Sequence, residues 1–300
     1  MNLLHEWPLV LFTLTVQLAV GLHLALLAAE ALPGPEDPRE PPGFRGRPFL
    51  LVGGLMAGAL AVSLLHLGAP VNALRTLSNL DESWLSREIL AALVFLGLWG
   101  LDFGIRRRSG GGTARGRSDV APAASRVLAW ATALAGLVLI WVMARIYMVP
   151  ARPLWDHWLT AAGFFSTTLL LGAVVAVAHL ARRSRPEGPA GTGLPPTGTA
   201  LLAFALAAAL AQAGVIFFHP VTEELMASPA GRSLTAVRLL LLLGGAMLLV
   251  IPLTRPALSG VRPSRAGRPG RWAAAALLLL GGSEVLGRML FYAAGIRNPF

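Results

Sequence analysis

The 300-residue chain has no cysteine and no lysine, and only 13% of its residues are charged. Without cysteine it can hold neither a disulfide scaffold nor a zinc or iron–sulfur centre ligated by its own thiolates. A soluble domain carries about a quarter charged residues, because its surface faces water. This chain has about half that share and is 55% hydrophobic, so much of its surface must face something other than water.

Long apolar runs take the place of the missing charge. A helix needs about 20 mostly apolar residues to cross a bilayer. Eight runs meet this need, at residues 8–32, 48–67, 85–105, 126–148, 154–181, 198–218, 234–254 and 272–293. The connections are short and rich in Pro, Gly and Arg, so we predict one all-α domain over residues 1–300, an integral membrane bundle of eight transmembrane helices. In the second run, the spacing of Gly54 and Gly58 predicts a helix–helix contact.

The arginines indicate the orientation of these helices. All 25 basic side chains are Arg, and a pI near 11.6 by itself suggests a nucleic-acid partner. Seventeen of them, however, lie in the connections after the first, third, fifth and seventh runs. Because basic loops stay cytoplasmic, we expect both termini on the outer, periplasmic side and no nucleic-acid partner. The first run lacks the basic leader and cleavage site of a signal peptide, so we expect it to remain as a helix.

Ionisable residues within membrane helices are energetically costly and are therefore candidates for function. In the predicted topology most of the polar residues outside the loops gather at the outer helix ends. The candidates are His66, Glu88, Arg145, Tyr147, Glu284 and Arg288. The inner ends offer little beyond Glu30, Asp102 and His179.

Each outer candidate also has a purely structural interpretation. Glu88 stands near the start of a helix, where a carboxylate complements the helix dipole. Glu284 and Arg288 are four residues apart and can pair on one helix face. Tyr147 fits an interfacial aromatic residue, and His66, between apolar neighbours, fits a buried structural histidine. Both kinds of interpretation stay open at this point.

The histidines do not suggest a haem site. A bis-histidine haem needs two histidines on facing helices at one depth. His23 lies in the inner half of the first run and His179 near the inner end of the fifth, and neither has an obvious partner. We expect no haem and no metal bound by this chain.

Several short motifs follow one another along the chain. They are HEWPLVLFT at residues 5–13, LHLGAP at 65–70, SREI at 86–89, ARIY at 144–147, and EVLGR at 284–288 followed by FY at 291–292. Together, and with eight spans, they resemble the membrane anchor subunit family of dimethyl sulfoxide reductase. Residues 154–254 resemble the family less.

This resemblance implies a subunit of a three-subunit anaerobic respiratory enzyme in the cytoplasmic membrane of a prokaryote. The anchor itself would carry no metal. It would hold a ferredoxin-like subunit with four [4Fe–4S] clusters, which contacts a molybdopterin-containing catalytic subunit. The anchor would bind menaquinol near its outer face, with His66 tied to quinol binding and Glu88 to proton handling.

The residues fit that chemistry. Oxidation of a quinol releases electrons and protons, and a histidine accepts a proton near neutral pH. We therefore expect His66 and Glu88 to act as catalytic groups, with His66 also contacting the quinol. The other expected quinol-binding residues are Arg145, Tyr147, Glu284 and Arg288. The expected contacts with the iron–sulfur subunit are Arg75 and Arg87.

Other interpretations remain open on the sequence alone. Related anchors serve complexes that pass electrons into quinone, for example from sulfite, and the sequence does not fix the direction. A purely structural anchor would bind no quinol analogue. A transporter is disfavoured because no file of charged residues crosses the membrane and no pair of interrupted helices is evident.

Overall fold

The computed structural model describes residues 7–31, 47–66, 79–110, 120–183, 196–259 and 269–297, and these residues form helices and short turns without a strand. The long helices are α1 (Trp7–Ala31), α2 (Arg47–His66), α4 (Trp84–Gly110), α5 (Val120–Tyr147), α6 (Trp158–Arg183), α7 (Pro196–Phe218), α9 (Pro229–Ser259) and α10 (Pro269–Arg297). Each predicted apolar run corresponds to one of them. The all-α prediction is confirmed for this part of the chain.

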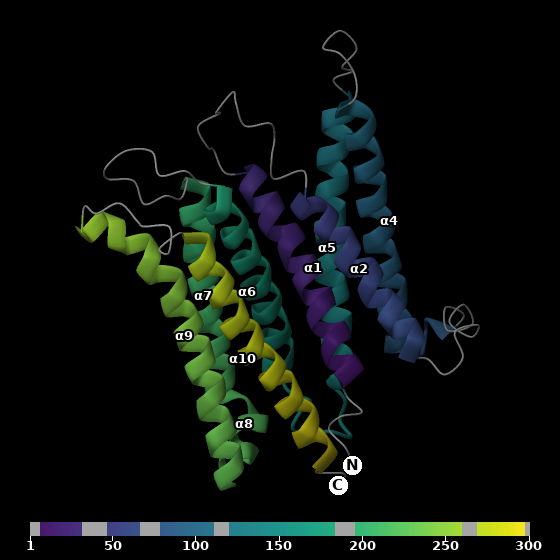
Figure 1. The fold of residues 1–300 in the computed structure, drawn as a ribbon. Helices are drawn as coiled ribbons and strands as arrows, with labels where there is room; N and C mark the ends of the chain where they lie inside the picture. Colours follow the sequence, from purple (N-terminus) through teal and green to yellow (C-terminus); the bar gives the residue numbers. More distant parts are fainter. Residues whose placement is uncertain are drawn as a thin grey trace.

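Seven of these helices are long and apolar enough to cross a membrane. The eighth, α2, has a shorter apolar stretch at Arg47–Ser63. An integral membrane bundle is therefore supported, whereas the number of crossings remains a prediction. Successive long helices run in opposite directions, so that α1 begins and α10 ends at the same end of the bundle (Figure 1). We call this the terminal end; that it faces the periplasm remains a prediction.

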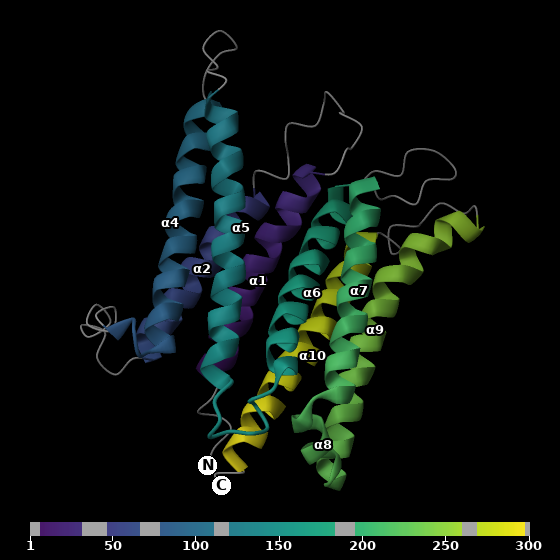
Figure 2. The same ribbon diagram turned by 180° about the vertical axis from the view of Figure 1, so that it is seen from behind.

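The long helices form two groups of four (Figures 1 and 2). The first unit contains α1, α2, α4 and α5, and the second contains α6, α7, α9 and α10. Helices α1 and α6 pack closely and join the two units. This seam is the main contact between the halves of the molecule.

Two glycines make the close approach at the seam possible. A Cβ atom at Gly21 of α1 would lie 1.9 Å from the carbonyl oxygen of Thr168 in α6. A Cβ atom at Gly172 would lie 2.0 Å from the carbonyl carbon of Gly21. One turn earlier in α1, the amide of Gln17 donates a hydrogen bond to the Phe164 carbonyl at 2.9 Å. Such backbone contact between small residues is typical of helix association in membranes.

The contact predicted for Gly54 and Gly58 is wrong within this chain. A Cβ atom on either glycine would meet nothing within 4 Å, because both face outward from α2. The neighbouring Gly53 makes the contact instead, against the indole ring of Trp99 in α4. That indole donates a hydrogen bond to the Phe49 carbonyl at 3.1 Å. A glycine of α2 does pack against another helix, but it lies on a different face from the predicted pair.

A short helix, α8 (Pro220–Met226), was not predicted and lies at the terminal end between α7 and α9. Pro220 at its first position supplies a preset backbone angle. His219 caps the helix with its side chain, which accepts a hydrogen bond from the Val221 amide at 3.1 Å. Helix α9 consequently begins at Pro229, earlier than the apolar run at residue 234 suggested.

Candidate functional site

The structure brings four of the predicted site residues to the terminal end of the first unit. Glu88 lies in the second turn of α4 and is only 5% exposed. Arg145 and Tyr147 lie in the last turn of α5. The backbone of His66 ends α2 at the same end (Figure 1), although its side chain lies outside the described part. Arg75 lies outside the described residues altogether.

Trp84 at the start of α4 packs against two arginine side chains. The guanidinium carbon of Arg87 lies 4.3 Å from the centre of the Trp84 ring, and that of Arg145 lies 5.3 Å from it. Arg87 also donates hydrogen bonds to the carbonyls of Leu80 and Asp81, at 2.8 Å and 2.7 Å. No described carboxylate forms an ion pair with Arg145.

The two tyrosines of the chain meet where the two units touch. Their hydroxyls share a hydrogen bond of 2.8 Å between Tyr147 of α5 and Tyr292 of α10. Trp155 packs edge-on against Tyr147 and donates its own hydrogen bond to the Phe291 carbonyl at 2.9 Å. Glu88 lies close enough for its charge to act on both phenols. Tyr147 therefore belongs to a packed aromatic cluster between the units, and its place at the membrane interface stays a prediction.

The predicted pairing of Glu284 with Arg288 is also wrong, since no ion pair joins these two described side chains. The Glu284 carboxylate, 3% exposed, accepts hydrogen bonds from Thr167 of α6 at 2.5 Å and from Gln212 of α7 at 2.9 Å. Ser166 in turn donates to the Gln212 side-chain oxygen. Glu284 thereby ties α10 to two other helices.

Arg288 faces the seam. Its guanidinium donates a hydrogen bond to the Gln17 side-chain oxygen at 2.9 Å and lies 3.8 Å from the centre of the Phe164 ring. Because Gln17 belongs to α1, this arginine links the second unit to the first. Tyr292, one turn further along α10, also reaches the first unit through its hydroxyl contact with Tyr147.

A cavity of about 60 Å³ lies between α6, α7, α8, α9 and α10. Its polar lining residues include Thr160, Gln212, His219, Thr235, Arg238 and Glu284. Phe164 and Phe291 form part of its apolar wall. Of the lining residues, Glu284 and Arg288 were predicted from the sequence as site residues.

His219 lines the cavity at its terminal end. Because its Nδ1 atom accepts a hydrogen bond from the Val221 amide, its Nε2 atom carries the proton and faces the Thr160 hydroxyl at 3.1 Å. Burial, together with the neighbouring charges of His157 and Arg238, lowers the pKa of His219 from 6.5 to about 4. The ring is thus held neutral. A histidine directly before a proline that starts a helix was the feature of the sequence that could have indicated this capping role.

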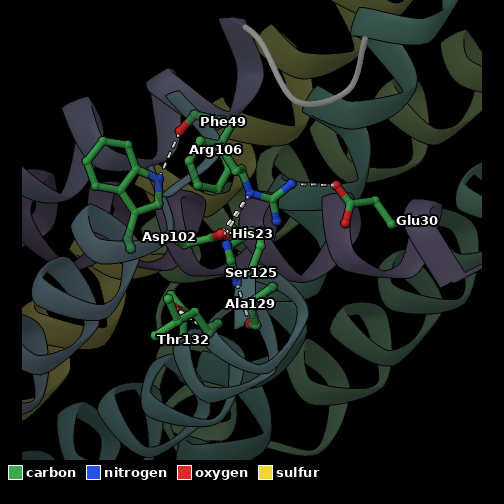
Figure 3. A network of polar contacts seen from close by, with 10 residues as sticks. His23, Glu30, Phe49, Asp102, Arg106, Ser125, Ala129 and Thr132 are labelled. Atoms are coloured by element: carbon green, nitrogen blue, oxygen red, sulfur yellow. Dashed lines mark hydrogen bonds and ion pairs between the residues drawn. The ribbon is translucent and has the colours of Figure 1, made fainter. Parts of the chain in front are cut away.

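A second polar network lies at the opposite end of the first unit (Figure 3). The Asp102 carboxylate of α4, 1% exposed, accepts hydrogen bonds from Arg106 at 2.9 Å and from Ser125 of α5 at 2.5 Å. Arg106 also bonds Glu30 of α1 at 3.3 Å. The network joins three helices of the first unit, and its spacing along α4 was visible in the sequence.

His23 lies beside this network in α1. One of its ring nitrogens, Nε2, faces the Ala129 carbonyl at 2.9 Å, and the ring packs edge-on against Phe95. The described residues contain no group of three or more His, Asp or Glu side chains that could hold a metal ion. The groups that could bind a quinol and exchange protons with it therefore lie at the terminal end.

The terminal end of the first unit offers a carboxylate, a phenol and a guanidinium in apolar surroundings. Such groups bind and orient a polar ring and exchange protons with it. The network at the opposite end is occupied with its own hydrogen bonds and is better suited to holding helices together.

Comparison with known proteins identifies the family. Residues 1–294 match the family model described as "DMSO reductase anchor subunit (DmsC)". Over 292 residues, covering 96% of this chain and 94% of the relative, the sequence is 30% identical to "Anaerobic dimethyl sulfoxide reductase chain YnfH" of Escherichia coli K12. It is 29% identical to the C subunit of anaerobic dimethyl sulfoxide reductase from Haemophilus influenzae, over 61% of this chain and 62% of that one. The protein therefore belongs to the DMSO reductase anchor subunit family.

Proposed function

We propose that this chain oxidises menaquinol at the terminal end of its first unit and passes the electrons to an iron–sulfur partner subunit. That subunit would serve a molybdopterin-containing catalytic subunit of the dimethyl sulfoxide reductase type. The observation that carries the proposal is the Glu88 carboxylate, which is only 5% exposed and lies at the same bundle end as the last turn of α5, with Arg145 and Tyr147, and as the end of α2 at His66.

The partners follow from family and composition. The relatives are named as chains of anaerobic dimethyl sulfoxide reductase, and the family is one of anchor subunits. Because this chain has no cysteine, it has no thiolate to ligate an iron–sulfur cluster. Electrons that leave a quinol here must therefore pass to clusters held by another subunit. Arg75 and Arg87 are proposed contacts with it.

The residues at the terminal end suit a quinol. The ring and tail would lie in the apolar surroundings, and menaquinol would supply the electrons. His66 accepts a proton from one hydroxyl, and Glu88 accepts and releases a proton towards the bundle end. Arg145 and Tyr147 orient the oxygens, while Arg288 and Glu284 continue the polar surface along α10.

The proposed site would lie at the outer side of the membrane. The distribution of arginines supports placing the terminal end at the periplasmic face of the cytoplasmic membrane. Protons from quinol oxidation would then leave on the outer side. The same groups would serve quinone reduction if the partner subunits supplied electrons, so activity is to be measured in both directions.

The test uses the complete complex in membranes. We expect His66→Ala and Glu88→Gln each to lower menaquinol-dependent reduction of dimethyl sulfoxide by on the order of 10²-fold, the scale of a lost general base. Reduction driven by an artificial donor that reaches the clusters directly should not change. Thr132→Val is the matched control, because Thr132 is buried in α5 and bonds only its own helix at the Leu128 carbonyl. Full menaquinol oxidation by His66→Ala would contradict the proposal.

A further inference from the structure

The cavity of the second unit is too small for a quinol ring. Its volume is about 60 Å³, whereas an engineered cavity that binds benzene measures about 150 Å³. A water molecule needs about 10–15 Å³ on this scale, so the cavity has room for roughly four. Its size thus selects a few water molecules or one small ion.

Its lining presents polar atoms without partners. Three buried atoms of the lining have no hydrogen-bond partner among the described residues: Oε1 of Glu284, Nε of Arg238 and the Thr235 hydroxyl oxygen. All three residues line the cavity. The set combines an acceptor, a donor and a group that is both, and water satisfies all three kinds.

The Arg238 guanidinium is held at the cavity wall by its fit to α10. A Cβ atom at Gly287 would lie 2.3 Å from the guanidinium carbon, so a larger residue there would displace the arginine side chain. The charged groups around Glu284 are Arg238 from α9 and Arg288 from its own helix, with His219 at the end of α7 and His157 beyond it. Two arginines against one carboxylate disfavour a metal cation.

The cavity also connects two depths of the bundle. Glu284 and Gln212 lie within the apolar spans, whereas His219 and Thr222 lie beyond the end of the span Thr197–Phe218. Arg288, one turn further along α10, also lines the cavity and reaches Gln17 of the first unit, and the Tyr292 hydroxyl meets Tyr147 of that unit.

We propose that this cavity is a water-filled proton-exchange site, in which Glu284 exchanges a proton with solvent at the α8 end of the bundle. In this step Oε1 of Glu284 forms an O–H bond with a proton taken from cavity water, and later returns the proton to water. No electron moves in the step. The protons come from quinol oxidation in the first unit, so the source, but not the hydration, rests on the proposed function.

Hydration is tested by a density map of the intact complex that resolves ordered water. The expected result is water within hydrogen-bond distance of both Glu284 Oε1 and Arg238 Nε. An empty cavity, a direct Glu284–Arg238 ion pair or a bound anion would overturn the proposal. This test needs no quinol and stands whether or not the protein oxidises one.

Proton exchange is tested in complexes reconstituted into liposomes. After a menaquinol pulse, Glu284→Gln should lower kcat and the rate of proton release at least about tenfold, with KM unchanged. Thr235→Val, which preserves the side-chain shape, should slow both to a smaller extent, and Thr132→Val should change neither. Glu284→Gln with wild-type kcat, or with a raised KM alone, would overturn the proposal.

The two proposals fail in different ways. If the wild-type complex does not oxidise menaquinol, or if His66→Ala oxidises it at full rate, the proposed function fails. If those results are as expected while Glu284→Gln and Thr235→Val behave as wild type, only the proton-exchange site fails.

Discussion

The α1–α6 seam leads to a quantitative prediction for Gly21→Ala. The added Cβ atom would lie 1.9 Å from the Thr168 carbonyl oxygen, roughly 1.5 Å closer than ordinary van der Waals contact allows. Because the neighbour is backbone, no side-chain rotation relieves the clash and the two helices must separate. Overpacking of this kind costs about 1–3 kcal/mol, and we expect the upper end of that range here.

The measurement is thermal unfolding of the purified complex in detergent, where the melting temperature should fall by several degrees. Gly54→Ala and Gly58→Ala are matched controls, because the same change there meets open space. Both controls should keep or raise the melting temperature, since alanine favours a helix over glycine. Equal destabilisation by Gly21→Ala and Gly54→Ala would refute this account of the seam.

Two further predictions concern polar groups. Asp102→Ala should destabilise the first unit by about 1–3 kcal/mol, because the partly exposed Arg106 loses its main partner but keeps Glu30. Chemical denaturation of the complex measures this loss. Asp102→Asn, which still accepts a hydrogen bond from Ser125, should lose less stability. His219 has a lower pKa folded than unfolded, so its contribution is complete above pH 6.5 and is lost as the pH falls towards 4, by up to about 3 kcal/mol. Melting temperatures measured across this range should fall less for His219→Asn, which keeps a capping oxygen; parallel curves would contradict the assignment.

The helices could be predicted because their signals are local. A run of apolar residues long enough to cross a bilayer is read directly from the sequence, and each predicted run is a helix. The common end of Glu88, Arg145 and Tyr147 followed from counting helix directions. The short helix α8 was not predicted, because a seven-residue helix has too few residues for a hydropathy signal.

The partners of Glu284 and Arg288 could not be predicted. Their spacing of four residues suggested a pair, but Glu284 bonds Thr167, 117 residues away, and Arg288 bonds Gln17, 271 residues away. Packing among the helices decides which face of a helix meets which neighbour. The spacing of residues along one helix does not reveal this. The same holds for the cavity, whose polar walls come from segments distant in the sequence.

The network around Asp102 could have been predicted in part from the sequence. Asp102 and Arg106 stand four residues apart near the end of an apolar run, which is the spacing of a helical ion pair. The pair lies at the end of the bundle opposite the terminal end, whereas the site residues were predicted for the other end. Only the additional bonds to Glu30 and Ser125 required the folded structure.

The central claim is that a quinol binds at the terminal end of the first unit. The most direct test is titration of the purified complex with a quinol-analogue inhibitor, comparing wild type with His66→Ala and Glu88→Gln. We expect saturable binding by the wild type that is weakened in both variants and unchanged in Thr132→Val. Absence of binding by the wild type, or undiminished binding by both variants, would contradict it.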